Sequence, residues 1–163
     1  MWGIVGNLLY LHSNTKIMRF IGDYPAKTDA KGRVFLPAAL RKVLEAEGVQ
    51  KLVLRQDIFQ HCLVLYPESV WNALFDDLKQ GLNQWNSKHQ MMLRQFVLDA
   101  EPIELDSNGR FLISKRKLQY ACIEADVRFV AVDDRIEVWS KCVLEDVMNG
   151  GSEVGANIEE LLG

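Results

Sequence analysis

The sequence has few cysteines, no excess of positive charge and no long apolar run, and each shortage excludes a class of protein. Its three cysteines are too few for a disulfide framework and form no Cys-x-x-Cys pair, which argues against a zinc ribbon or a dithiol redox site. The three histidines are scattered and lack the spacing of metal ligands. We therefore expect a folded protein in a reducing, cytoplasmic setting, with no metal and no cofactor.

The formal net charge of −3 excludes binding to nucleic acid through bulk positive charge. Any contact to phosphate must come from local clusters of Lys and Arg. Near the N-terminus, the apolar stretch at residues 2–11 is too short to span a bilayer, and no basic residue precedes it as in a signal peptide. We expect no membrane partner, and we interpret residues 1–17 as an extended or non-native segment.

One pattern occurs twice. Asp-Ala-Lys-Gly-Arg at residues 29–33 recurs as Asp-Ser-Asn-Gly-Arg at residues 106–110. After each copy come an apolar run, a short helical pattern and two apolar strands joined by a tight turn. These helices and strands are predicted at 38–47, 51–56 and 61–66 in the first copy, and at 115–123, 127–132 and 135–140 in the second. Four elements in the same order indicate a tandem repeat.

Each copy of the pattern has the composition of a turn. An Asp side chain can accept a hydrogen bond from the backbone two residues on, and Gly supplies the positive φ that closes a hairpin. The predicted turn residues are Asp29, Gly32, Asp106 and Gly109. Arg33 and Arg110 therefore lie just past the tip of a hairpin.

The segments after the turns predict short buried elements. Residues 34–36 and 111–113 are continuously apolar, which favours buried strands. Pro37 suits the first position of a helix, where no amide donor is needed. Gly48 is typical of a helix end.

A different composition separates the repeats. Apolar residues at helical spacing are interrupted at Gly81, and Ser-Lys-His-Gln at residues 87–90 predicts a capping box that opens a second helix. This favours a helical hairpin. The predicted organisation is an extended segment at 1–17, a first module at 18–69, a helical linker at 70–98, a second module at 99–147 and a flexible tail at 148–163.

The pair of Gly-Arg hairpin tips, with the basic residues downstream of them, is the strongest functional signal. In the second repeat, three basic residues come shortly after the apolar run. They follow Ser114, a plausible N-cap, in the first turn of a helix, where cations oppose the helix dipole unless an anion such as DNA phosphate binds there. Taken alone, such a run is more often a solvated basic face. Its proximity to Arg110 and its echo in the first repeat favour DNA. The basic candidates are Lys115, Arg116 and Lys117, with Lys31, Arg33, Arg41 and Lys42.

These motifs resemble the MraZ family, part of the wider AbrB-like group of DNA-binding modules. The resemblance rests on residues 29–33 with Pro37, on residues 106–110, and on Leu-Val-Leu-Tyr-Pro at 63–67. It covers roughly residues 18–147. It implies a mixed, mainly β fold in which tandem AbrB-like modules form an intertwined, pseudo-symmetric β-barrel with short helices.

The resemblance also implies a function. Members of such a family bind double-stranded DNA as sequence-specific transcriptional regulators, with several chains in a homo-oligomeric ring. The expected targets are short direct repeats at the promoter of a division and cell-wall gene cluster, in the nucleoid. Lys31 and Arg33 match the DNA-contacting positions of the first copy, and Asn108 and Arg110 those of the second. Asn108 replaces a lysine and Ser114 replaces a proline, so the second loop is less basic.

An enzyme is one alternative, because duplicated halves that each donate an aspartate also describe aspartic proteases. Those enzymes need two carboxylates that share a proton, in Asp-Thr/Ser-Gly loops. Here each aspartate has an arginine close by in its own turn, and this arginine should keep the carboxylate ionised. The sequence contains neither a nucleophile elbow nor a phosphate-binding Gly-rich loop. We expect no enzyme and no small-molecule substrate.

An antitoxin-like module that binds a protein is the second alternative. Trp71, Trp85, Met91 and Met92 in the linker could serve such an interface. Core packing or contact between protomers explains these residues more simply. A charged, extended C-terminal arm would support this alternative, whereas the tail is short and contains glycine.

Overall fold

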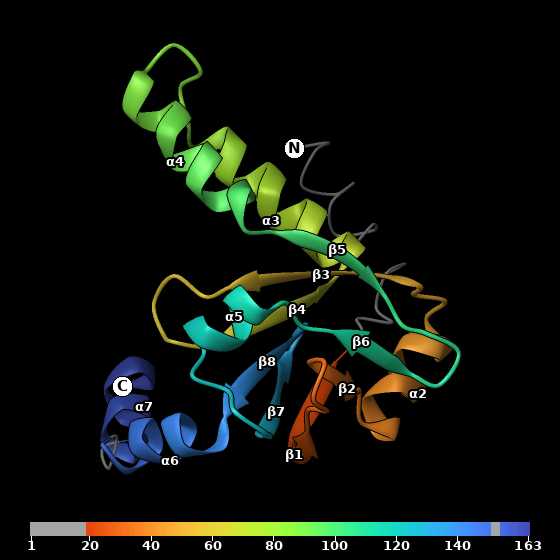
Figure 1. Ribbon diagram of the computed structural model, residues 1–163. Helices are drawn as coiled ribbons and strands as arrows, with labels where there is room; N and C mark the ends of the chain where they lie inside the picture. The colour runs from red at the N-terminus through yellow and green to blue at the C-terminus, as the bar shows by residue number, and fades with distance from the viewer. Residues whose placement is uncertain (1–18, 151–153) are drawn as a thin grey trace.

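The computed structural model describes residues 19–150 and 154–163 (Figure 1), so the segment at 1–17 lies outside the described residues. In order, the first repeat contains β1 (Phe20–Lys27), β2 (Arg33–Phe35), α2 (Ala38–Ala46), β3 (Lys51–Gln56) and β4 (Leu63–Pro67). The linker contains α3 (Glu68–Gln80) and α4 (Ser87–Leu98). The second repeat contains β5 (Glu101–Glu104), β6 (Arg110–Leu112), α5 (Lys115–Tyr120), β7 (Asp126–Asp133) and β8 (Arg135–Ser140), and α6 (Lys141–Asn149) and α7 (Val154–Leu162) follow.

The two repeats exchange strands. A six-stranded antiparallel sheet has the order β1-β7-β8-β4-β3-β5, and β2 pairs with β6 in a separate two-stranded ribbon. In this order β1 of the first repeat pairs with β7 of the second, and β5 of the second pairs with β3 of the first. The halves are therefore intertwined around the central β4–β8 pair. A mixed, mainly β fold of tandem modules is confirmed.

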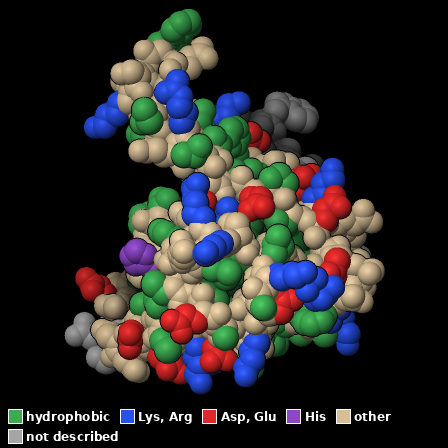
Figure 2. Space-filling model, viewed as in Figure 1, with side chains coloured by type: hydrophobic (Ala, Val, Ile, Leu, Met, Phe, Trp, Pro, Cys, Tyr) green, Lys and Arg blue, Asp and Glu red, His purple; other side chains and the backbone are tan. Residues whose placement is uncertain are grey.

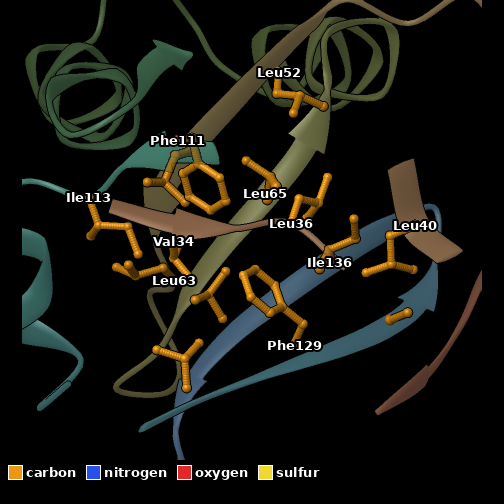
Figure 3. Close-up of a cluster of buried hydrophobic side chains, with 14 of the residues drawn as sticks. Val34, Leu36, Leu40, Leu52, Leu63, Leu65, Phe111, Ile113, Phe129 and Ile136 are labelled. Carbon is orange, nitrogen blue, oxygen red and sulfur yellow. The ribbon is translucent and has the colours of Figure 1, made fainter. Parts of the chain in front are cut away.

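The core lies between the ribbon and the sheet. In Figure 3 side chains from both ribbon strands point toward side chains of the sheet. Phe111 of the ribbon packs edge-on against Phe129 of β7, with 6.2 Å between the ring centroids. The ribbon strands and the residue after each contribute Val34, Leu36, Phe111 and Ile113, and the sheet contributes Leu52, Leu63, Leu65, Phe129 and Ile136, all at most 3% exposed. Neither half could form this core alone.

The apolar runs predicted ribbon strands that are buried along their whole length, and this prediction is wrong. Phe35 and Leu112 are each 54% exposed, whereas their neighbours in both runs are buried. Side chains alternate between the two faces of a strand. Because only one face of the ribbon covers the sheet, the middle residue of each run points to solvent.

Several predicted boundaries shift by a few residues. Pro37 is the N-cap of α2 rather than its first helical residue. Asn86 caps α4 in place of the predicted Ser87, since its side chain accepts hydrogen bonds from the amides of Lys88 and His89. The end of α2 at Gly48 is confirmed by a φ of 67°. In addition, β4 begins at Leu63, and α5 ends at Tyr120.

The predicted helical hairpin is confirmed, and Figure 1 shows α3 and α4 standing away from the sheet. Neither helix contains a buried residue. Trp71 and Phe96 stack within the hairpin, with 5.0 Å between ring centroids, whereas Trp85 in the turn is 87% exposed. The tail contains the exposed helix α7, and its flexibility stays a prediction. None of the described helices is long and apolar enough to cross a membrane.

Candidate functional site

The two Asp-to-Arg segments form equivalent turns, which we call the first loop (residues 29–33) and the second loop (residues 106–110). The prediction that they are hairpin tips is wrong, because β1 and β5 lie in the six-stranded sheet whereas β2 and β6 pair with each other. In the first, Asp29 Oδ1 accepts hydrogen bonds from the amides of Lys31 and Arg33, each at 2.9 Å. In the second, Asp106 Oδ1 accepts the equivalent two bonds at the same distance. The glycines of the loops have φ of 88° and 82°, a conformation that glycine adopts without strain.

Each aspartate also holds the arginine of its own loop. Arg33 Nε donates to Asp29 Oδ2 at 2.8 Å, and Arg110 Nε donates to Asp106 Oδ2 at 3.0 Å. The pKa of both carboxyls is lowered, chiefly by the hydrogen bond from the backbone N–H of that arginine. Within the described residues, the Nη atoms of both arginines make no hydrogen bond to the protein. The far edge of each guanidinium is thus available to a ligand.

The two arginines lie on the same exposed surface, the outer face of the β2–β6 ribbon. The strands pair with Arg33 opposite Leu112 and Phe35 opposite Arg110, and these four residues make up what we call the ribbon face. Arg33 and Arg110 are diagonal neighbours, for which the separation across a sheet is roughly 7–8 Å. The guanidinium carbon of Arg110 lies 5.6 Å from the centroid of the Phe35 ring.

Strand exchange places each loop beside the helix of the other repeat. The amide of Leu36, just before α2, donates to Gly109 O of the second loop at 3.0 Å. The amide of Ile113, just before α5, donates to Gly32 O of the first loop at 2.9 Å. Arg41 of α2 packs so closely on Gly109 that an added Cβ would lie 2.4 Å from its Nη1. Arg41 thereby supplies a cation beside the loop that has asparagine in place of lysine.

The predicted basic cluster at the start of α5 does not form one surface. Lys117 is buried, and its Nζ lies 3.4 Å from Asp99 Oδ1 and 3.2 Å from Glu101 Oε2. Arg116 is exposed and pairs with the same Asp99 oxygen at 3.4 Å. Lys115 is exposed at the end of the helix nearer the ribbon. The ammonium of Lys117 is therefore paired with two carboxylates of the chain and is not on the surface.

Two residues of the ribbon face were not among the sequence candidates. Phe35 and Leu112 were assigned to the core because their runs are uniformly apolar. The signal that identifies them is their position two residues after a turn arginine. Because side chains alternate between the two faces of a strand, each lies on the same face as that arginine. The remaining basic candidates, Lys31 and Lys42, are exposed, as is Asn108.

The surface carries no uniform charge on the side shown in Figure 2. Lys and Arg side chains form small separate groups there, with acidic side chains among them. This agrees with the net charge of −3. In the described ranges no three His, Cys, Asp or Glu side chains are grouped so as to hold a metal ion.

Two interlocked copies of one β-rich module, each contributing a Gly-Arg loop to a shared ribbon, define a tandem-repeat protein. A family model described as "MraZ protein, putative antitoxin-like" matches residues 20–95 and again residues 96–149. The chain belongs to the MraZ family. Its two matches correspond to the two repeats, although the boundary between them falls within α4.

Curated relatives are similar over most of their length. The chain is 55% identical over 146 residues to the transcriptional regulator MraZ of Phocaeicola vulgatus, which spans 90% of this chain and 95% of that protein. It is 51% identical to the protein of the same name from Bacteroides fragilis, over 90% and 92% of the two chains. The relative from Carboxydothermus hydrogenoformans is 31% identical over 86% and 94%. These relatives are named as transcriptional regulators and not as enzymes.

Proposed function

We propose that this chain is a sequence-specific DNA-binding transcriptional regulator and that the ribbon face enters the major groove. The observation that carries the proposal is the pair Arg33 and Arg110, which lie on one exposed face with each Nε held by an aspartate. The names of the curated relatives support a role in transcription.

The dimensions of the ribbon suit the major groove. That groove is about 12 Å wide and admits a two-stranded β-ribbon, and Arg can donate two hydrogen bonds to O6 and N7 of guanine. Because each arginine is held at Nε, its Nη edge can make this bidentate contact with a smaller loss of side-chain freedom. The diagonal spacing of roughly 7–8 Å corresponds to about two base-pair steps of 3.4 Å.

Residues around the ribbon face would contact the sugar-phosphate backbone. Such contacts fix the position of a protein on DNA but carry no sequence information directly. The exposed or partly exposed side chains in and beside the loops are suited to this role, and the buried Lys117 is not. The proposed backbone contacts are Lys31, Asn108, Arg41, Lys42 and Lys115; Arg116 contributes less, because Asp99 already neutralises part of its charge.

Assembly into a ring on direct repeats is part of the proposal. Neither helix of the α3–α4 hairpin has a buried residue, and Trp85, Met91 and Met92 are exposed. A second copy of the chain that covers this hairpin would bury apolar surface and bring more ribbon faces to one DNA molecule, which raises avidity. The proposed site of action is the promoter of a division and cell-wall gene cluster in the cytoplasmic nucleoid.

The test is a binding titration with DNA from upstream of the encoding gene and with a scrambled sequence. Arg33→Ala should lower the preference for the upstream DNA by about 5- to 150-fold, the equivalent of 1–3 kcal/mol for a bidentate contact to guanine. Arg33→Lys should lose most of this preference as well, because lysine keeps the charge but not the planar pair of donors.

The matched control is Lys141→Ala, since Lys141 is an exposed cation of α6, which Figure 1 shows apart from the ribbon. It should bind both DNAs as the parent does. If Arg33→Ala binds both DNAs with the parent's preference, the first loop is only a structural turn and the proposal is wrong.

The family description favours one alternative, an antitoxin-like protein that uses the hairpin to bind a different protein. Light scattering on the purified chain distinguishes self-association through the hairpin from binding of a different protein. A multi-subunit assembly that Trp85→Glu dissociates supports self-association through the hairpin. A monomer at micromolar concentration would contradict the ring.

A further inference from the structure

We infer that Phe35 is a positioning residue, which fixes the guanidinium of Arg110 for base recognition and makes the two arginines of the ribbon face unequal. The inference rests on the proposed function of that face. Phe35 faces Arg110 across the ribbon, and the ring centroid lies 5.6 Å from the guanidinium carbon. A guanidinium over an aromatic face within about 6 Å is attracted by the ring quadrupole.

Arg110 is consequently held from two sides. Asp106 Oδ2 accepts from its Nε at 3.0 Å, while its guanidinium carbon lies over the Phe35 ring, 5.6 Å from the centroid. Its side chain is 25% exposed, against 38% for Arg33. A guanidinium that is restrained by two contacts loses less freedom when it makes a planar, bidentate contact.

Arg33 is held by the equivalent carboxylate of its own loop, Asp29, but it has a different neighbour across the ribbon. The residue opposite Arg33 is Leu112, which has no ring and cannot make the equivalent contact. The asymmetry therefore arises from one pair of related positions, Phe35 in the first repeat and Leu112 in the second. Phe35 is 54% exposed despite its size, so core packing does not account for it.

The test measures base preference one position at a time. Single base-pair changes are introduced into the bound DNA, and Arg110→Ala first identifies the position that Arg110 recognises. Phe35→Leu, which copies the residue of the other repeat, should reduce the preference at that position by about two- to fivefold, the size of an exposed cation–π contact. Affinity for scrambled DNA should not change. Phe35→Tyr keeps the ring and should restore the preference.

Two further variants separate positioning from direct contact with DNA. In the Arg110→Ala background, Phe35→Leu should have no additional effect, because residues that act through one another are not additive. Leu112→Phe should increase the preference at the position recognised by Arg33. Circular dichroism confirms that each variant is folded.

The outcomes are distinct. If Arg110→Ala and Arg33→Ala leave all preferences unchanged, the proposed function fails. If Arg110→Ala acts but Phe35→Leu does not, the positioning role fails and the proposed function stands. If Phe35→Leu costs as much with Ala at 110 as with Arg, Phe35 contacts DNA itself and the positioning role is again wrong.

Discussion

Substitution of Lys117 has opposite expected effects for the two possible positions of its side chain, buried in the protein or on the DNA-binding surface. Its ammonium lies 3.4 Å from Asp99 and 3.2 Å from Glu101, and its side chain is 8% exposed. Removing one partner of a fully buried ion pair costs about 3–5 kcal/mol, because a charge is left without compensation. Glu101 is 45% exposed, and Arg116 still reaches Asp99, so both carboxylates keep some compensation.

We expect Lys117→Met to lower the free energy of unfolding by about 2–3 kcal/mol, below that range for these reasons. Methionine retains the volume of the lysine stem, so the loss reports the charge and not a cavity. Urea denaturation followed by circular dichroism measures it. The control is Lys115→Ala, which removes an exposed cation from the same helix and should change stability by less than about 0.5 kcal/mol.

For binding to DNA, we expect the substitution at Lys115 to have the larger effect and the substitution at Lys117 the smaller one. Lys115→Ala should reduce the slope of log affinity against log salt by about one, as expected for one lost phosphate contact. Lys117→Met should leave this slope unchanged under conditions where the variant is folded. A variant at 117 that is as stable as the parent and has a reduced slope would refute the buried ion pairs and return Lys117 to the DNA surface.

Gly32→Ala should destabilise the protein by more than about 1–2 kcal/mol, the usual cost of a left-handed residue, because its Cβ would also lie 2.6 Å from the backbone oxygen of Ile113. Gly48→Ala has a similar φ and no neighbour within 4 Å, so urea denaturation of the two variants isolates the clash. Burial raises the pKa of the Cys62 thiol, so a thiol reagent at pH 8 should label the two exposed cysteines rapidly and Cys62 only in denaturant. The lowered pKa of the loop aspartates means that their ionised form stabilises the fold above pH 3.8; this contribution should disappear as the pH falls further, and thermal melting against the double Asp→Asn variant measures the loss.

The sequence predicted the repeat, most elements and the loop arginines because these depend on local chemistry. An aspartate followed by glycine makes its turn within five residues, and periodic apolar residues make strands and helices wherever the segment is placed. Both strands of the ribbon therefore lie where the pattern indicated.

Consequences of tertiary packing were not predictable from local patterns. The position of Lys117 is the example: in the repeat it corresponds to Leu40, a core residue that is 1% exposed. Only the packing of α5 against β5 and the end of α4 reveals the two carboxylates that accompany a cation in the interior. The exposure of Phe35 depends on which face of the ribbon meets the sheet, and in the sequence only its position two residues after Arg33 indicates that face.

The covalent link between the two modules gives the ribbon a direction. A dimer of identical modules would present two identical ends and would match a palindromic sequence. In this chain one end has lysine and a leucine neighbour, whereas the other has asparagine and an aromatic neighbour. Chains arranged head to tail around a closed ring would present all their ribbons in the same sense, so the matching DNA would repeat its sequence in one orientation and not invert it.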